Sequence, residues 1–240
     1  MIALLVVTIL ASGIALPLAT QVQMRRQDEA RRLLEEAHDA LLGFAAAHGR
    51  LPCPATIDSL GQEAFAIGGS AVDGACATFH GGFLPGAALG LAGLDAQGFV
   101  RDPWASERNR VRYAVHGAAI NGVANPLTRV NGMQMATLAG LGAAPHYLFI
   151  CTSGAAANGS GCGPASSQLT RRAAFVILST GLNGAVEPVP GSDEARNLDG
   201  DAVFVHREAS MAAGREFDDQ LLWVPIHLVV SRLMSAGRLP

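Results

Sequence analysis

The sequence contains no lysine and little charge of either sign. Only 15% of its 240 residues are charged, the basic residues are all arginine, and the formal net charge is −3. A protein that binds nucleic acid through its phosphates normally presents clustered positive charge. The composition therefore gives no electrostatic reason to expect a nucleic-acid partner.

The short motifs that reveal many catalytic and metal sites are also missing. The chain has no GxSxG nucleophile elbow, no HExxH zinc motif and no CxxC pair. Its histidines are dispersed, at His38, His48, His80, His116, His146, His206 and His227. We therefore do not expect an enzyme, and a hydrolase assembled from distant segments is the less favoured alternative.

The first 24 residues carry no charged side chain, and the first charge is Arg25. A helix over residues 1–24 would be about 36 Å long, enough to cross about 30 Å of hydrocarbon. No basic leader precedes the apolar run, as a cleaved export signal would require. We predict that residues 1–24 form the membrane-spanning half of a helix, kinked at Pro17. A cleaved signal and a buried core helix are the alternatives.

The helical pattern continues over residues 25–49. Apolar residues recur there every three or four positions and form one stripe, Leu33, Ala37, Ala40, Leu41, Phe44 and Ala45. Gly49 ends the pattern, and Pro52 and Pro54 prevent its resumption. We expect this amphipathic continuation to pack against a domain formed by residues 50–240.

Residues 50–240 are numerous enough to bury a core of their own. Five stretches have the composition of strands: RVRYAVHG, PHYLFIC, RRAAFVILSTG, DAVFVHRE and DDQLLWVP. The stretch HLVVSRLMSAG then predicts a last amphipathic helix. The predicted fold class is α+β, with the long N-terminal helix packed on a C-terminal antiparallel sheet.

The four cysteines are Cys53, Cys76, Cys151 and Cys162. The simplest of their three pairings joins 53 with 76 and 151 with 162, and closes two glycine-rich loops. Sequence alone does not choose among the pairings, and four buried free thiols are the alternative. Disulfides form in oxidising compartments, so we expect a periplasmic or extracellular domain.

Three features, in order along the chain, resemble type IV pilins and the pseudopilins of type II secretion. The apolar N-terminal helix, with LLVV and IALP within residues 4–17, is similar to the pilin helix. RDPWASERNRVRYAV is similar to a signature of the major pseudopilins through Asp102, Pro103, Trp104 and Tyr113. LSTGLNG (178–184) and FDDQLLW (217–223) are similar to their C-terminal segments.

The resemblance implies a structural subunit of a type IV pilus or type II secretion-type filament. Such a subunit sits in the inner membrane before assembly, with its globular domain in the periplasm. Its partners are inner-membrane lipid, the assembly platform, and other pilin-like subunits bound through the N-terminal helix. A membrane-anchored binding module that does not polymerise is the alternative.

The chain departs from the family in three respects. No leader ending in glycine and no glutamate shortly after it are present, which predicts a start codon upstream of Met1 or a loss of leader processing. Ala105 follows the DPW motif where the family has glycine. The chain is also longer than a major pseudopilin, which favours a minor or specialised subunit.

The resemblance also implies a calcium ion, which stabilises the C-terminal loop of the major pseudopilins. The matching positions are Asn183, Asp218 and Asp219, with Asn183 in place of an aspartate. The nearby acidic segment GSDEARNLDGDAV offers further oxygen donors, Asp193, Glu194, Asn197, Asp199 and Asp201.

From these two sets we predict one calcium site. Its ligands would be Asn183, Asp199, Asp201, Asp218 and Asp219, provided that strands 173–180 and 202–207 pair as a hairpin. A solvated turn is the alternative interpretation of the acidic segment.

Overall fold

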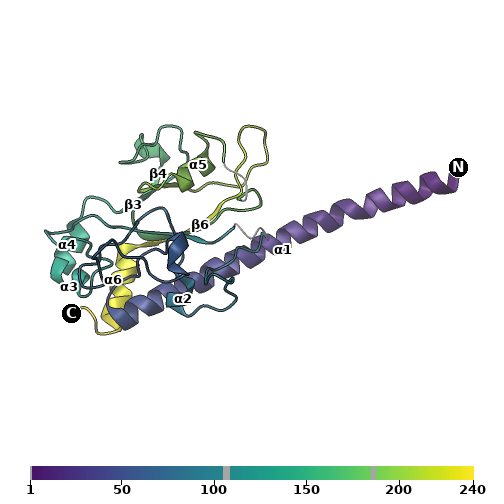
Figure 1. Cartoon of the computed structure of the whole chain (residues 1–240). Helices are drawn as coiled ribbons and strands as arrows, with labels where there is room; N and C mark the ends of the chain where they lie inside the picture. The colour runs from purple at the N-terminus through teal and green to yellow at the C-terminus, as the bar shows by residue number, and fades with distance from the viewer. Residues whose placement is uncertain (1, 105–108, 185–187) are drawn as a thin grey trace.

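The computed structural model describes the backbone of residues 2–104, 109–184 and 188–240, and within these ranges the side chains from residue 21 onward. A long helix, α1 (Ile2–His48), leads into a domain built around one six-stranded sheet. In Figure 1 the second half of α1 lies along this domain and its first half extends away from it. The described chain is α+β.

The sheet is centred on its longest strand. Its members are β1 (Gly82–Phe83), β2 (Arg112–Val115), β3 (Leu148–Cys151), β4 (Gln168–Ser179), β5 (Val203–Val205) and β6 (Gln220–Pro225). β4 pairs antiparallel with β2, β3 and β6. The short helices are α2 (Gly86–Leu89), α3 (Gly132–Ala136), α4 (Leu138–Ala143) and α5 (Asp193–Leu198), and α6 (Ile226–Ser235) is the last helix. The five stretches with strand composition correspond to β2 through β6.

The prediction that the sheet is purely antiparallel is wrong at one strand. β5 pairs in parallel with β3, so that Phe149 lies opposite Val203 and Cys151 opposite Val205. The predicted hairpin between 173–180 and 202–207 does not form, because α5 and its flanking loops carry the chain past β4 to the edge of β3. Parallel neighbours require a crossover of this kind.

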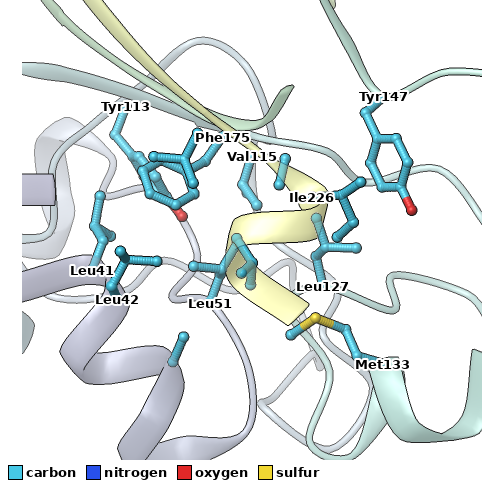
Figure 2. Close-up of a cluster of buried hydrophobic side chains, with 14 of the residues drawn as sticks. Leu41, Leu42, Leu51, Tyr113, Val115, Leu127, Met133, Tyr147, Phe175 and Ile226 are labelled. Atoms are coloured by element: carbon cyan, nitrogen blue, oxygen red, sulfur yellow. The ribbon is translucent and has the colours of Figure 1, made fainter. Parts of the chain in front are cut away.

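The second half of α1 buries one face against the sheet domain. The fully or nearly fully buried residues of this face are Ala30, Leu34, Ala37, Leu41, Leu42 and Ala45. All of these except Ala30 join the main core, in which Figure 2 shows Leu41 and Leu42 of α1 near Tyr113 of β2 and Phe175 of β4. The small alanines let the helix approach the sheet, and the leucines fill the space between them. The predicted apolar stripe is therefore nearly correct, rotated slightly from its expected centre.

The prediction of a membrane-spanning half of this helix is contradicted. No helix within the described residues is both long enough and apolar enough to cross a bilayer. Over residues 21–48, α1 is charged on its exposed side, for example at the Arg31–Glu35 pair. The side chains of residues 1–20, on which the prediction mainly depended, lie outside those described. The architecture is corrected to a long helix on a mixed sheet, and a single-pass inner-membrane anchor is not supported.

The C-terminus of α1 is held by the other end of the chain. Gly49 adopts a left-handed conformation (φ +69°) that ends the helix, as expected of a glycine in this position. The guanidinium of Arg238 then donates hydrogen bonds to the carbonyls of Ala46 and Ala47, two of the groups that a helix end leaves without partners. α6 packs beside this end of α1.

Both disulfides of the structure are local. Cys53 bonds to Cys76 and Cys151 to Cys162, which are the two pairs that the spacing favoured. The first closes a loop between α1 and β1, and the second closes the loop after β3. Restricting the unfolded chain in this way contributes about 3 kcal/mol per bridge in the chain-entropy account.

We expect Leu41→Ala to lower the free energy of unfolding by about 2–5 kcal/mol, because the side chain is fully buried between α1 and the sheet. The control is Glu36→Ala on the exposed side of the same helix, which should change it by less than about 0.5 kcal/mol. Urea unfolding of both variants measures the difference. Equal effects would show that α1 does not depend on this packing.

Candidate metal centre

The candidate site lies where β4 ends beside the start of β6. Because the two strands pair antiparallel, with Ser179 opposite Gln220, the residues that follow β4 meet the residues that precede β6. The amide of Leu182 donates to Asp218 Oδ2 at 2.8 Å. Gly181 (φ +65°) makes this approach possible, since a Cβ there would lie 2.1 Å from Asp218 Oδ1.

Helix α5 supplies a third acidic side chain to this meeting point. The side chain of Ser192 caps α5, which places Glu194 in the first turn, where it is almost fully buried. Glu194 Oε1 accepts from the amide of Asp218 at 3.0 Å, and Oε2 accepts from Asn183 Nδ2 at 2.8 Å. Oxygen atoms of Glu194, Asp218 and Asp219 all lie within 4.8 Å of one another.

Asp219 is almost fully buried as well. Its Oδ2 accepts from Asn197 Nδ2 at 2.7 Å, and Asn197 also bonds both the amide and the carbonyl of Val205 in β5. Burial raises the pKa of Asp219 to about 8, with Glu194 and Asp218 adding to the effect and the hydrogen bond from Asn197 opposing it. Without a cation nearby, this carboxyl therefore holds a proton at neutral pH.

The DPW segment reaches the same loop from another side. Asn109 Nδ2 donates to the carbonyl of Gly181 at 2.9 Å, and the carbonyl of Asn109 accepts from the amide of Asp102. Asp102 is 2% exposed, and burial raises its pKa. The pKa of Asp218 is also raised, first by burial and then by Glu194 and Asp102. Burial raises the pKa of all three carboxyl groups, and neighbouring carboxylates raise those of Asp218 and Asp219 further, which opposes their ionising together.

The donor set fits a hard divalent cation. None of the ion pairs among the described residues includes Asp102, Glu194, Asp218 or Asp219. Asp218 Oδ1 and Asp102 Oδ2 are buried without a hydrogen-bond partner in the part of the chain that the structure describes. Calcium prefers carboxylate and amide oxygens, and two positive charges would offset the repulsion of this group.

Of the five predicted calcium ligands, the structure brings together Asn183, Asp218 and Asp219. Asp199 and Asp201 lie past the other end of α5, where both face Arg196, at 2.6 Å and 3.3 Å. Their carboxylates are thus engaged by Arg196, and neither belongs to the group of oxygens formed by Glu194, Asp218 and Asp219. The predicted hairpin that would have brought Asp199 and Asp201 beside Asp218 is absent.

Glu194 and Asp102 are members of the cluster that the predicted ligand set omits. Glu194 stands in the acidic segment, and the signal that could have selected it is Ser192, which fixes the start of α5 and hence the direction of Glu194. Asp102 belongs to the DPW segment, but nothing in the sequence shows that this segment reaches the end of β4.

Comparison with known proteins finds no relative of this chain: no protein-family model, no curated protein and no solved structure matches it. What can be inferred about its function therefore comes from its own residues and their arrangement.

We expect the pH dependence of stability to reveal Asp219. Its pKa is about 8 in the folded chain and about 3.9 when unfolded, so only the folded state keeps this proton in between. With metal removed by a chelator, the contribution of Asp219 to the free energy of unfolding is therefore complete below about pH 4. It is lost as the pH rises from there through 8. Asp219→Asn should unfold at a higher temperature than the wild type at pH 8.5, and at the same temperature at pH 4. Parallel pH profiles of the two proteins would contradict the assignment.

Calcium should raise the unfolding temperature of the wild type. At pH 8.5 the wild type should then unfold at a higher temperature than Asp219→Asn. At a hundredfold excess of calcium over the dissociation constant, binding stabilises the fold by about 2.7 kcal/mol. Asp218→Ala should lose most of this gain, and Asp199→Ala, outside the cluster, should keep it. Thermal unfolding in calcium and then in excess chelator is the measurement. No difference between calcium and chelator in the wild type would remove the ion from the site.

Proposed function

We propose that this chain is a structural subunit of a filament of the type IV pilus or type II secretion class, similar to a pseudopilin. The observation that carries the proposal is the arrangement of α1, whose second half packs on a sheet domain while its first half extends away from it (Figure 1). One helix thus serves two purposes, as the core of a domain and as a projecting element.

The composition of the projecting half supports assembly. Residues 1–24 contain no charged side chain. An apolar helix with no domain of its own exposes a large apolar surface to water, and association with copies of itself removes that surface. In the proposed filament these helices would bundle along the axis, and the sheet domains would form the outer wall.

The acidic cluster supports a structural role for calcium in that wall. Glu194, Asp218, Asp219 and the side-chain oxygen of Asn183 would hold the ion. When bound, calcium supplies the positive charge that the described cluster lacks. These residues come from α5, from the start of β6 and from the loop after β4, so the ion would join three segments at one edge of the sheet. Asn109 ties the DPW segment to that loop.

The two disulfides support an oxidising location for the domain. Cys53, Cys76 and Cys162 lie outside the named helices and strands and Cys151 ends β3, so each bridge closes a loop. Such bridges persist in the periplasm or outside the cell. We therefore propose that the sheet domain functions outside the cytoplasm, with other filament subunits as its partners.

A cavity beside the cluster favours a second candidate function, an extracytoplasmic binding module that does not polymerise. This cavity of about 820 Å³ lies between the loop that includes Pro188, Val189 and Pro190 and the segment that includes Arg207 and Arg215. Its volume is within the range of small-molecule sites. The experiment that follows separates the two candidates.

We expect residues 1–24 to mediate assembly of many copies. The four native cysteines are all in disulfides, so Thr8→Cys with Thr20→Cys introduces two free thiols. These thiols lie about 18 Å apart along α1, and a shorter bis-maleimide joins them only between chains. A filament subunit should give a ladder of crosslinked multimers.

A matched pair of charge variants provides the control. Added to the double-cysteine chain, Ile14→Glu should abolish the ladder, because it places a charge in the uncharged half of α1. Val72→Glu, at an exposed position of the sheet domain, should leave the ladder intact. A monomer alone, or a ladder that survives Ile14→Glu, would reject helix-driven assembly and favour the binding module.

A further inference from the structure

Two histidines line a cavity beside the middle of β4, away from the end of β4 where the acidic residues lie. His116 directly follows β2, and only Tyr147 separates His146 from the start of β3. Their backbones are fixed by β4, since the amide of His116 donates to the carbonyl of Ala174 at 2.9 Å and the amide of Tyr147 donates to that of Arg171 at 2.8 Å. The two imidazole rings lie perpendicular, with centroids 6.3 Å apart, and both line a cavity of about 260 Å³.

The position of His146 suits a ligand that binds a metal through Nε2. Its Nδ1 lies 3.3 Å from the carbonyl oxygen of Tyr147. A carbonyl only accepts hydrogen bonds, so this contact favours the tautomer with the proton on Nδ1, which leaves Nε2 for a metal. Histidines that bind metals commonly donate their other ring N–H to a carbonyl or carboxylate in this way. The ring also packs against that of Phe149, with centroids 5.1 Å apart.

His116 brings a second imidazole with no assigned task. It is 4% exposed and packs against the ring of Tyr147 at 4.8 Å. Neither ring nitrogen has a side-chain hydrogen bond to any other described residue. The ring lines the cavity, so its nitrogens are available to an ion there.

A third donor lines the same cavity. Asn121 Nδ2 donates to the carbonyl of Ala136 at 3.2 Å, which leaves its Oδ1 directed elsewhere and able to accept or to coordinate. Gly140 packs against the side chain of Asn121 and leaves no room for a Cβ, so the asparagine is held in place. Two imidazoles and one amide oxygen, completed by water, suit a borderline cation better than calcium.

We propose that His116 and His146 form a binding site for a divalent transition-metal ion, such as Zn²⁺ or Cu²⁺, in this cavity. With metal–nitrogen distances of about 2.0–2.1 Å, two imidazoles on one tetrahedral ion would have centroids about 5 Å apart. The rings must therefore approach by about 1 Å. His146 is exposed and can make this movement by rotating its side chain. The proposal does not depend on the proposed filament function.

Titration of the full chain with Zn²⁺, followed by calorimetry, tests the site. Saturating Ca²⁺ is present throughout, so that the acidic cluster does not take the added metal. The wild type should bind one Zn²⁺ in the micromolar range or tighter. His146→Gln should weaken that binding about tenfold or more. His227→Gln changes an exposed histidine of α6 and is the matched control, which should bind as the wild type does.

A second readout uses Cu²⁺ and does not depend on affinity alone. The electron paramagnetic resonance spectrum of the bound Cu²⁺ should show two coordinated imidazole nitrogens in the wild type and one in His116→Gln. Circular dichroism checks that this variant is folded. If His116→Gln does not fold, His146→Gln, at an exposed position, gives the same comparison. Unchanged Zn²⁺ binding in His146→Gln, or an equal loss in His227→Gln, would overturn the proposal.

Discussion

β4 is covered on one side by the buried face of α1 and is paired along its edges with β2, β3 and β6. This contact between one helix and one strand fixes the rest of the domain. The start of β6 is placed beside the end of β4, which creates the acidic cluster. The end of β2 and the start of β3 are placed beside the middle of β4, which brings His116 and His146 together. Both candidate sites are therefore consequences of what pairs with a single 12-residue strand.

The two candidate sites differ in the donor atoms that they offer to a metal. At the end of β4, carboxyl groups from several segments share a volume with little hydrogen-bonding capacity to spare, and Asp219 responds by retaining its proton. At the histidine cavity the donors are imidazole nitrogens from one buried and one exposed side chain. Carboxylate oxygens favour a hard cation, and imidazole nitrogens favour a borderline transition metal. The two sites therefore differ in metal preference because their donor atoms differ.

Local patterns in the sequence predicted much of this fold. The alternation and β-branched content of segments such as RRAAFVILSTG identified the strands, and the spacing of Ala37, Leu41 and Ala45 identified the buried face of α1. Loop composition favoured the two disulfide pairs. The uncharged run at the start of the chain led to the prediction of a membrane-spanning half, which the described residues contradict. The length of an apolar run does not show whether lipid or protein covers the helix.

Contacts between distant segments were not predictable in the same way. The parallel pairing of β5 with β3 depends on where α5 turns the chain, and it separates Asp199 and Asp201 from the cluster. Glu194 and Asp102 enter it through the cap at Ser192 and through the loop at Gly181. The histidine pair joins residues 30 positions apart whose neighbourhood exists only once β4 lies between their strands.

The contact of Arg238 with the end of α1 has a consequence for how the chain acquires its structure. The first helix finds its partners in β4, β6 and α6, and its last turn is closed by a residue two positions from the C-terminus. Loops that long must close before the favourable contacts form, which slows folding. A chain emerging from a ribosome or an export channel cannot complete this core until Arg238 and the residues before it are free to fold back on α1. The apolar face of α1 therefore stays available to chaperones until those residues have been made and released.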